Sequence, residues 1–281
     1  MQDFLFCLFF DRINKVSFMK YVLVTGAYGG MGKATIKLLK EKGYFIFALD
    51  KKVEEKEDNI LPIECDITSE KSILLAFEEV KKVTNQLFAI IHYAGIYMLN
   101  SLVEIEHAKF EKIFKINLFG AFLINKTFLP LLKDRSKIIM TTSELAPLDP
   151  LPFTGLYAIT KSALDKYAYS LRMELQLLNI SVSTLRAGAV NTGMLNVSMS
   201  ELDDFCNNTK LYNYNAKRFM NIVNSVEAKK VLPIKVAKKT YKILNKKNPK
   251  FAYSINRNKL LILLNILPKR LQFWIIRKIL K

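Results

Sequence analysis

The sequence is poor in the residues from which disulfide frameworks and metal centres are built. It contains three cysteines, Cys7, Cys65 and Cys206, and two histidines, His92 and His107. An odd number of widely spaced cysteines indicates a reducing compartment rather than a disulfide framework, so we expect a cytoplasmic protein. The two histidines lack metal-ligand spacing and have no cysteine partners nearby, so we expect no metal site.

The first eighteen residues are not typical of a membrane span or of a secretory signal. The apolar stretch Phe4–Phe10 falls short of the roughly 18 apolar residues that a spanning helix needs. No basic residue precedes it and no small-residue cleavage site follows it, so a signal peptide is not indicated. We expect residues 1–18 to be an N-terminal extension ahead of a true translation start at Met19. A short amphipathic anchor is the alternative.

Acidic residues are absent from the C-terminal region. Residues 228–281 contain 16 Lys or Arg and no Asp or Glu, so most of the formal net charge of +18 lies there. This asymmetry indicates an anionic partner, either a nucleic acid or a membrane surface. The region has no helix-turn-helix or RNA-binding signature, so we expect no nucleic acid.

Residues 256–281 combine these cations with apolar side chains. The run 258–267 is interrupted by Asn265, and Pro268 then breaks the helical pattern. The remainder, 269–281, mixes a Trp, a Phe and aliphatic residues with five cations, which suits the headgroup boundary of a bilayer. We expect this basic amphipathic segment to bind an anionic membrane surface peripherally, at its inner face. The alternative is that its apolar residues cover the pocket or join two copies in a homo-oligomer.

The remainder of the chain shows strand-like apolar runs that alternate with helical patterns. With 281 residues, 51% of them hydrophobic, the chain can bury a substantial core. The alternation predicts an α/β fold, a doubly wound, Rossmann-like parallel sheet with helices on both faces, as a single domain over residues 19–255. The predicted strands are 21–24, 44–49, 60–65, 86–91, 137–142 and 180–185, and the predicted helices are 33–41, 69–82, 102–132 and 156–178.

A glycine-rich turn, residues 25–32, connects the first predicted strand to the first predicted helix. Its glycines let the backbone approach a ligand closely, and the helix N-terminus points free N–H groups at an anion. Asp50 follows about 20 residues later, where a carboxylate can bind the ribose hydroxyls of a dinucleotide. Tight turns alone also need glycine, but strand, turn, helix and acid together favour a dinucleotide site.

Six residues fall where the predicted strands end. Because the carboxyl ends of parallel strands share one edge of the sheet, and ligands bind beyond that edge, we expect one shared site there. These residues are Gly26, Asp50, Asp66, Ala94, Ser143 and Arg186.

Several motifs together resemble the short-chain dehydrogenase/reductase family. The TGxxxGxG cofactor motif, a helix asparagine, a serine, the YxxxK motif and a segment that contacts the nicotinamide occur in the family's order. They are residues 25–32, Asn117, Ser143, residues 157–161 and residues 186–192, within a resemblance that covers about residues 19–253.

The resemblance implies an NAD(P)-dependent oxidoreductase that interconverts a secondary alcohol and a ketone by hydride transfer. It implies that Tyr157 is the general acid/base and that Lys161 binds the nicotinamide ribose. It also implies that Ser143 holds the substrate oxygen and that Asn117 positions a water that relays protons. The cofactor-binding residues that it implies are Thr25, Gly26, Tyr28, Gly29, Gly30, Met31, Gly32, Asp50, Asp66, Ile67, Ala94, Gly95, Tyr157, Lys161, Val190 and Thr192.

Tyr157 and Lys161 fit this chemistry by their spacing as well. They are four residues apart on a predicted helix, so they share a face. A nearby ammonium favours the phenolate, so we expect Lys161 to lower the pKa of Tyr157 towards working pH. Without the cofactor site beside them, a Tyr and a Lys at this spacing would be ordinary helix surface.

Two positions depart from the family pattern. Residues 92–95 read His-Tyr-Ala-Gly where the family has NNAG, so the asparagine that braces the adenosine side is missing. Ala187 replaces the usual proline before Gly188, which loosens the start of the following loop.

Cofactor choice depends on the charges near Asp50. A carboxylate there binds a 2′-hydroxyl and repels a 2′-phosphate, and Gly29 stands where NADP-using relatives often carry a basic residue. We expect NAD in preference to NADP, with Lys51 and Lys52 partly offsetting the repulsion. Asp66 resembles the family's adenine contact, and a cap for the following helix explains it equally well.

The segment 193–231 is rich in apolar residues and predicts a lid over the substrate. Such a lid would line a pocket for a lipophilic alcohol or ketone, such as a steroid, a retinoid-like compound or a long-chain lipid. Ordinary packing of the lid is the alternative. A second class of function also stays open, a non-catalytic NAD-sensing or nucleic-acid-binding protein on the same fold.

Overall fold

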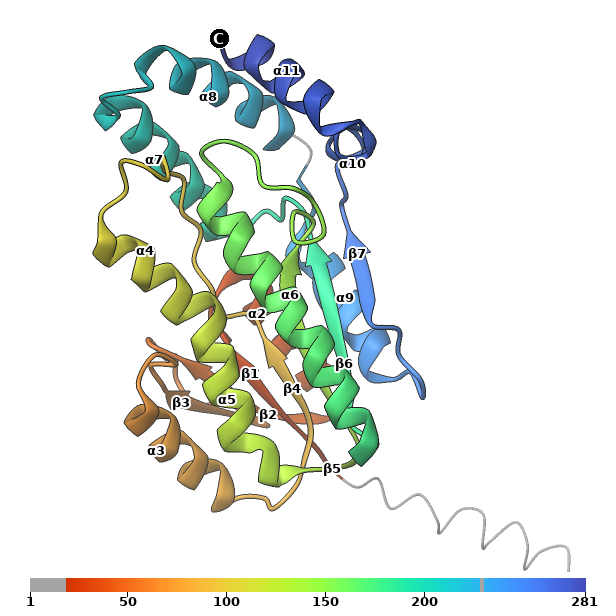
Figure 1. Cartoon of the computed structure of the whole chain (residues 1–281). Coiled ribbons are helices and arrows are strands. Elements are labelled where there is room, and N and C mark those ends of the chain that lie inside the picture. The colour runs from red at the N-terminus through yellow and green to blue at the C-terminus, as the bar shows by residue number, and fades with distance from the viewer. Residues whose placement is uncertain (1–18, 228–229) are drawn as a thin grey trace, which may run out of the picture.

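The computed structural model describes residues 19–227 and 230–281, so the predicted N-terminal extension lies outside the described residues. The described residues form a seven-stranded parallel sheet in the order β3-β2-β1-β4-β5-β6-β7 (Figure 1). The predicted doubly wound α/β fold is confirmed. The strands are β1 (Lys20–Thr25), β2 (Tyr44–Asp50), β3 (Ile60–Glu64), β4 (Leu87–His92), β5 (Leu132–Ser143), β6 (Ser181–Ala187) and β7 (Ala252–Ile255).

Helices cover both faces of this sheet. In Figure 1, α3, α5 and α6 lie in front of the strands, whereas α2 and α9 pack together behind them. The helices are α2 (Gly30–Glu41), α3 (Glu70–Lys81), α4 (His107–Phe114), the π-helix η1 (Lys115–Phe119), α5 (Gly120–Phe128), η2 (Leu129–Leu131), α6 (Gly155–Leu175), η3 (Gln176–Leu178), α7 (Gly193–Asn208), α8 (Asn213–Glu227), α9 (Pro233–Leu244), α10 (Lys259–Ile266) and α11 (Lys269–Leu280).

The strands send alternate side chains into two separate cores. On β1, Leu23 packs among side chains of α3, α5 and α6, whereas Val22 and Val24 pack among those of α2 and α9. All three are fully buried, as expected where a parallel sheet is covered on both faces. The two cores therefore fix the strand ends that carry the candidate site.

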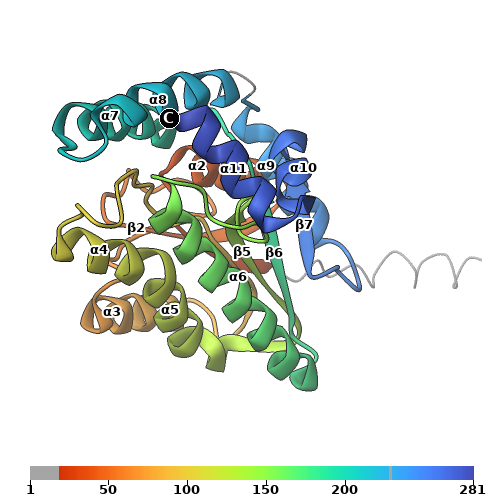
Figure 2. The ribbon, with the colours of Figure 1, turned by 45° about the horizontal axis from the view of Figure 1, so that its top comes forward.

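The chain reverses its direction across the sheet at β1, which lies between β2 and β4. The connections that leave β1 and β4 diverge there, and a crevice forms beyond their carboxyl ends. Figure 2 shows α7, α8, α10 and α11 gathered at this end of the molecule.

Three elements differ from the sequence prediction. Strand β5 begins at Leu132 rather than at residue 137. The long helix begins at His107 rather than near residue 102, because the preceding residues form a loop that contacts the lid. In that loop the Glu104 carboxylate accepts hydrogen bonds from the Thr209 hydroxyl (2.7 Å) and from the Lys210 backbone N–H (2.8 Å), both in the turn between α7 and α8. The seventh strand, β7, was not predicted, because four residues are too few to show an alternating pattern.

The C-terminal helices pack against the lid and the loop after β5. Helices α8 and α11 lie side by side in Figures 1 and 2, and the Asn215 side chain donates to the Leu280 carbonyl (2.6 Å). Lys269 forms an ion pair with Asp149 in the loop before α6. Within the described residues, no helix is both long and apolar enough to cross a membrane.

Candidate active site

The turn after β1 brings three backbone segments into close contact. Gly26 has a φ of 65°, and a Cβ atom there would lie 2.5 Å from the backbone nitrogen of Ala94. A Cβ on Gly32 would lie 2.2 Å from the Gly26 carbonyl oxygen, and one on Gly30 would lie 2.7 Å from the Thr192 side chain. Only glycine fits these positions, and the turn leads into the N-terminus of α2, where backbone N–H groups can bind an anionic phosphate. These residues fit a dinucleotide.

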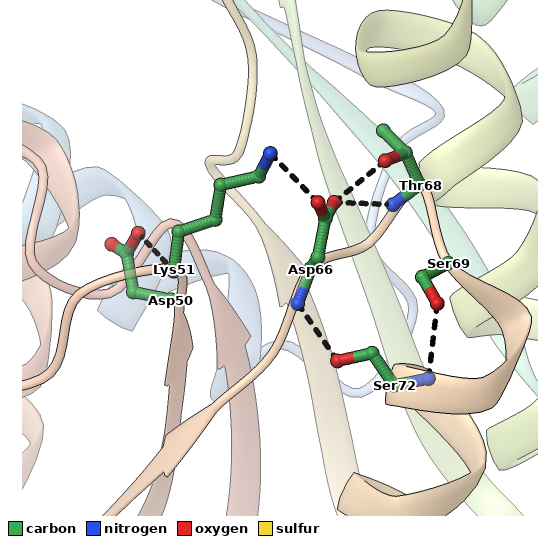
Figure 3. Close-up of polar contacts among 6 residues, drawn as sticks. All are labelled: Asp50, Lys51, Asp66, Thr68, Ser69 and Ser72. Atoms are coloured by element: carbon green, nitrogen blue, oxygen red, sulfur yellow. Dashed lines mark hydrogen bonds and ion pairs between the residues drawn. The ribbon is translucent and has the colours of Figure 1, made fainter.

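The carboxylate of Asp50 faces this turn. It accepts hydrogen bonds from the backbone N–H of Tyr28 (2.9 Å) and of Lys51 (2.8 Å). The Lys51 ammonium extends away from it and pairs with Asp66 at 2.8 Å, as Figure 3 shows. Burial acts to raise the pKa of Asp66, but its bonds with Lys51 and Thr68 outweigh this and lower the pKa.

Two adjoining cavities lie beyond the strand ends. The first, which we call the cofactor groove, runs along the glycine turn and is bordered by Asp50, Ile67, Ala94 and Gly193. The second, which we call the substrate cavity, has a volume of about 210 Å³ and contains Ser143, Tyr157, Lys161 and Val190. Residues common to both linings are Met31, Tyr93, Gly95, Tyr97 and Thr192, so the two cavities are contiguous.

Two of the four predicted catalytic residues, Asn117 and Lys161, meet at Gly95. A Cβ on Gly95 would lie 3.2 Å from both the Lys161 Nζ and the Asn117 Oδ1. Asn117 sits in the π-helix η1, where its side chain exchanges two hydrogen bonds with the backbone of Ile96 (2.8 and 3.0 Å). Lys161 donates to the Thr141 carbonyl (3.2 Å). Both side chains are therefore held by backbone groups.

Burial determines the protonation of the tyrosine–lysine pair. It raises the pKa of Tyr157 to about 12, and a hydrogen bond with Ser143 offsets only part of this rise. It lowers the pKa of Lys161 to about 8. The expectation that Lys161 lowers the pKa of Tyr157 is therefore wrong for this structure, since removal from water outweighs the effect of the neighbouring amine.

Four of the predicted residues, among them the catalytic candidate Asn117, lie outside the linings of both cavities. The side chain of Arg186 turns to Asp165 on α6 and forms an ion pair (2.6 Å) that fastens this helix to β6. Asp66 is engaged by Lys51 and Thr68, and Thr25 is buried beneath the turn. The strand ends therefore lie at one edge of the sheet, but not every side chain on them lines a cavity, and the shared site stays a prediction.

The departures from NNAG are accommodated by buried hydrogen bonds. The Tyr93 hydroxyl lies between Thr35 on α2 (2.9 Å) and Thr240 on α9 (2.7 Å). The His92 ring is paired with Asn125 (2.9 Å), and burial lowers its pKa to about 4, so it is neutral. Tyr93 thus braces the two helices that lie behind the sheet at this end.

Glu144 and Leu261 are among the residues of the substrate cavity that were not predicted from the sequence. Glu144 directly follows Ser143, which was a usable signal. Leu261 belongs to α10, so the C-terminal segment covers the pocket with at least this side chain. For this segment, the sequence leaves covering of the pocket as the alternative to membrane binding.

A model of the short chain dehydrogenase family matches residues 20–203, and the chain belongs to this family. It is an NAD(P)-dependent oxidoreductase that acts on CH–OH groups, which sets aside the non-catalytic alternative. This agrees with a glycine turn that fits a dinucleotide and an adjoining cavity that holds Ser, Tyr and Lys.

Several proteins of known name are similar to this chain. The chain is 27% identical to a 3-ketodihydrosphingosine reductase of Bacteroides thetaiotaomicron over 82% of this chain and 85% of the relative. It is 31% identical to the estradiol 17-beta-dehydrogenase 2 of Mus musculus over 62% of this chain and 49% of the relative. A short chain dehydrogenase family structure from Francisella tularensis has a TM-score of 0.71 and 22% identity over 84% of this chain and 97% of that chain.

Lys161 is expected to make the protein more stable as the pH rises. Its pKa is about 8 in the folded chain against 10.5 ordinarily, so between these values the unfolded chain binds more protons. The charged, buried form costs stability below pH 8, and this cost disappears above pH 10.5. We expect a gain of up to about 3 kcal/mol in unfolding free energy across this window, measured by urea denaturation.

Lys161→Met is the control for this measurement, because it keeps the length of the side chain without the charge. The difference between wild type and variant removes the contributions of other titrating groups. An equal pH dependence in both proteins would show that Lys161 does not titrate as described.

Proposed function

We propose that the protein interconverts a lipophilic secondary alcohol and its ketone, with Tyr157 as the general acid/base. The observation that carries this proposal is the convergence of Ser143, Tyr157 and Lys161 in an apolar cavity contiguous with the cofactor groove. The nicotinamide, when bound, exchanges a hydride with the substrate carbon. The residues of this chain are then needed to orient the substrate oxygen and to move one proton.

Each catalytic residue has a separate role in this proposal. Ser143 binds the substrate oxygen, and the Tyr157 hydroxyl donates a proton to it during reduction or accepts one during oxidation. With a pKa of about 12, Tyr157 is protonated at neutral pH and ready to act as the acid. Lys161 binds the nicotinamide ribose, and Asn117 positions a water that relays protons. Both side chains are adjacent to Gly95.

The lipophilic substrate is supported by the cavity lining. Apolar side chains come from the loop after β5, the lid and the C-terminal helix α10. They are Leu145, Leu151, Phe219, Ile222, Val223 and Leu261. The two curated relatives described above carry sphingosine and estradiol in their names, which is consistent with a large apolar substrate.

Tyr157→Phe should reduce kcat by about 10²–10⁴-fold, the usual contribution of a general acid. NADH binding, followed by fluorescence titration, should change little because the ring remains. Tyr167→Phe, on the same helix but bonded to Asn125 outside the cavity, is the matched control. Near-normal turnover in Tyr157→Phe would show that Tyr157 is not the general acid/base.

The preference for NAD over NADP rests on the contacts of Asp50. Two backbone N–H groups hold its carboxylate at the edge of the cofactor groove. Lys51, which could have neutralised it, is engaged with Asp66 (Figure 3). Lys33, which also lines the groove, pairs with Glu54, so Lys52 and Lys112 are the other cations of the lining. Because Asp50 lies at the ribose position, we expect its repulsion of a 2′-phosphate to dominate.

NAD should therefore give the higher kcat/KM, and Asp50→Ala should narrow the difference between the cofactors. Initial rates with each cofactor measure this directly, with Glu64→Ala at the exposed end of β3 as a control for lost surface charge. A wild-type preference for NADP of tenfold or more, about 1.4 kcal/mol, would mean that the lysines outweigh Asp50.

The C-terminal helices present an apolar surface that suits a bilayer. Its side chains are between 50% and 75% exposed and are accompanied by exposed cations on the same two helices. We call this set the C-terminal apolar face: Leu260, Leu263, Ile266, Phe273, Trp274 and Ile279. Aromatic and aliphatic side chains beside cations favour the headgroup boundary, and each cation adds about 1 kcal/mol near an anionic leaflet. Peripheral binding at the membrane surface would bring α10, which forms part of the wall of the substrate cavity, close to lipophilic substrates in the bilayer.

The full chain should co-sediment with anionic vesicles at low salt and less with zwitterionic ones. Phe273→Ser combined with Trp274→Ser should weaken this binding, whereas Leu177→Ser, equally apolar and 82% exposed on η3, should not. Point variants are preferable to truncation, because Leu261 and Leu280 are packed against the domain. A wild-type chain that stays in the supernatant, or that self-associates through this face, would contradict membrane binding.

A further inference from the structure

Glu144 is an acidic residue in an otherwise largely apolar cavity. It directly follows Ser143 at the end of β5, and its backbone N–H donates to the Ala187 carbonyl (3.0 Å). It lines the substrate cavity beside Tyr157. The proposed reaction gives Glu144 no role.

The Glu144 carboxylate has one hydrogen-bond donor in the described part of the chain. The backbone N–H of Asn258 donates to its Oε2 at 2.5 Å. The other oxygen, Oε1, lies so close to Gly188 that a Cβ there would be 2.8 Å away. Burial raises the pKa of this carboxyl, although the Asn258 bond and the charge of Arg257 act in the opposite direction.

No ion pair neutralises Glu144 among the residues that the structure describes, although the chain has 43 Lys and Arg. A carboxylate removed from water is unfavourable unless a cation or several donors satisfy it. Its cavity is open to a ligand, so a cationic group on that ligand would supply the missing partner. A metal ion would need several oxygen ligands, whereas one carboxylate in an apolar cavity suits an organic amine with an apolar body.

We propose that Glu144 binds a protonated amine of the substrate, and that the substrate is a long-chain amino ketone or the matching amino alcohol. This inference rests on the proposed function, which puts the carbonyl oxygen at Ser143 and Tyr157. Ser143 and Glu144 line the same cavity, so one substrate can place its oxygen at Ser143 and an amine at Glu144. An amine on a carbon close to the carbonyl fits this arrangement. The apolar chain would then extend along the lid.

Glu144 also has a structural contact that the test must separate from amine binding. Its bond with Asn258 holds the residue that caps the N-terminus of α10, whose Leu261 forms part of the cavity wall. Glu144→Gln keeps an oxygen acceptor for the Asn258 N–H and removes only the charge. Glu144→Met, of similar length, removes the acceptor as well and serves as a second variant.

The test compares one ligand with and without its charge, bound to the protein saturated with NADH so that no reaction occurs. Calorimetry gives the Kd of a short-chain dihydrosphingosine and of its N-acetyl derivative. The wild type should bind the free amine at least about tenfold more tightly, as a charge-assisted bond in a desolvated site implies. Glu144→Gln should lose this preference while its Kd for the N-acetyl form stays within about twofold.

Equal wild-type affinities for the two ligands would overturn the proposal, and so would an equal weakening of both in Glu144→Gln, which would indicate an anchoring role alone. If Glu144→Gln fails to fold, Glu144→Met must show the loss of preference. Turnover is measured separately with the ketone forms. Amine preference without any turnover would support the inference and contradict the proposed function, whereas turnover of plain ketones without amine preference would do the reverse.

Discussion

The active site depends on the close approach of the turn after β1 to the end of β4. A Cβ atom at Gly26 would lie 2.5 Å from the backbone of Ala94, so two strand ends meet with no side chain between them. This contact aligns the start of α2 with Gly95, and Gly95 in turn leaves room for Lys161 and Asn117. The cofactor groove and the substrate cavity join at this point. A larger residue would separate the strands and with them the two halves of the site.

Removal from water is the second constraint that shapes the site. It moves the pKa of Tyr157 up to about 12 and that of Lys161 down to about 8, so both groups are shifted towards their neutral forms. The Lys161 Nζ lies 5.8 Å from the centre of the Tyr157 ring, near enough for the charge of one group to affect the other. A ligand that displaces water from the substrate cavity would therefore change the pKa values of both groups.

The sequence predicted the strands and turns, which depend on local pattern. It did not predict features that depend on contacts between distant segments. The strands around Gly26 and Asp50 were predictable, because buried parallel strands and glycine turns leave strong local signals. The pKa of Tyr157 was not, since spacing along a helix reveals a neighbour but not the depth of burial. For Leu261 the sequence left membrane binding and covering of the pocket as alternatives, because apolar periodicity does not tell which face meets the domain. Glu144 was overlooked beside Ser143, because its significance comes from the apolar lining that distant segments provide.

The π-helix η1, which contains Asn117, requires a fixed number of residues between α4 and α5. Its closing bond runs from the Gly120 N–H to the Lys115 carbonyl, which places one more residue in the turn than an α-helix holds. That extra residue lets the Asn117 side chain reach the backbone of Ile96 while α5 continues in register with the core. Loss of a single residue between 115 and 119 would close this turn as an ordinary α-helix and move Asn117 away from the backbone of Ile96. Insertions and deletions that loops accept elsewhere are therefore excluded here, and the spacing between α4 and α5 is fixed by geometry.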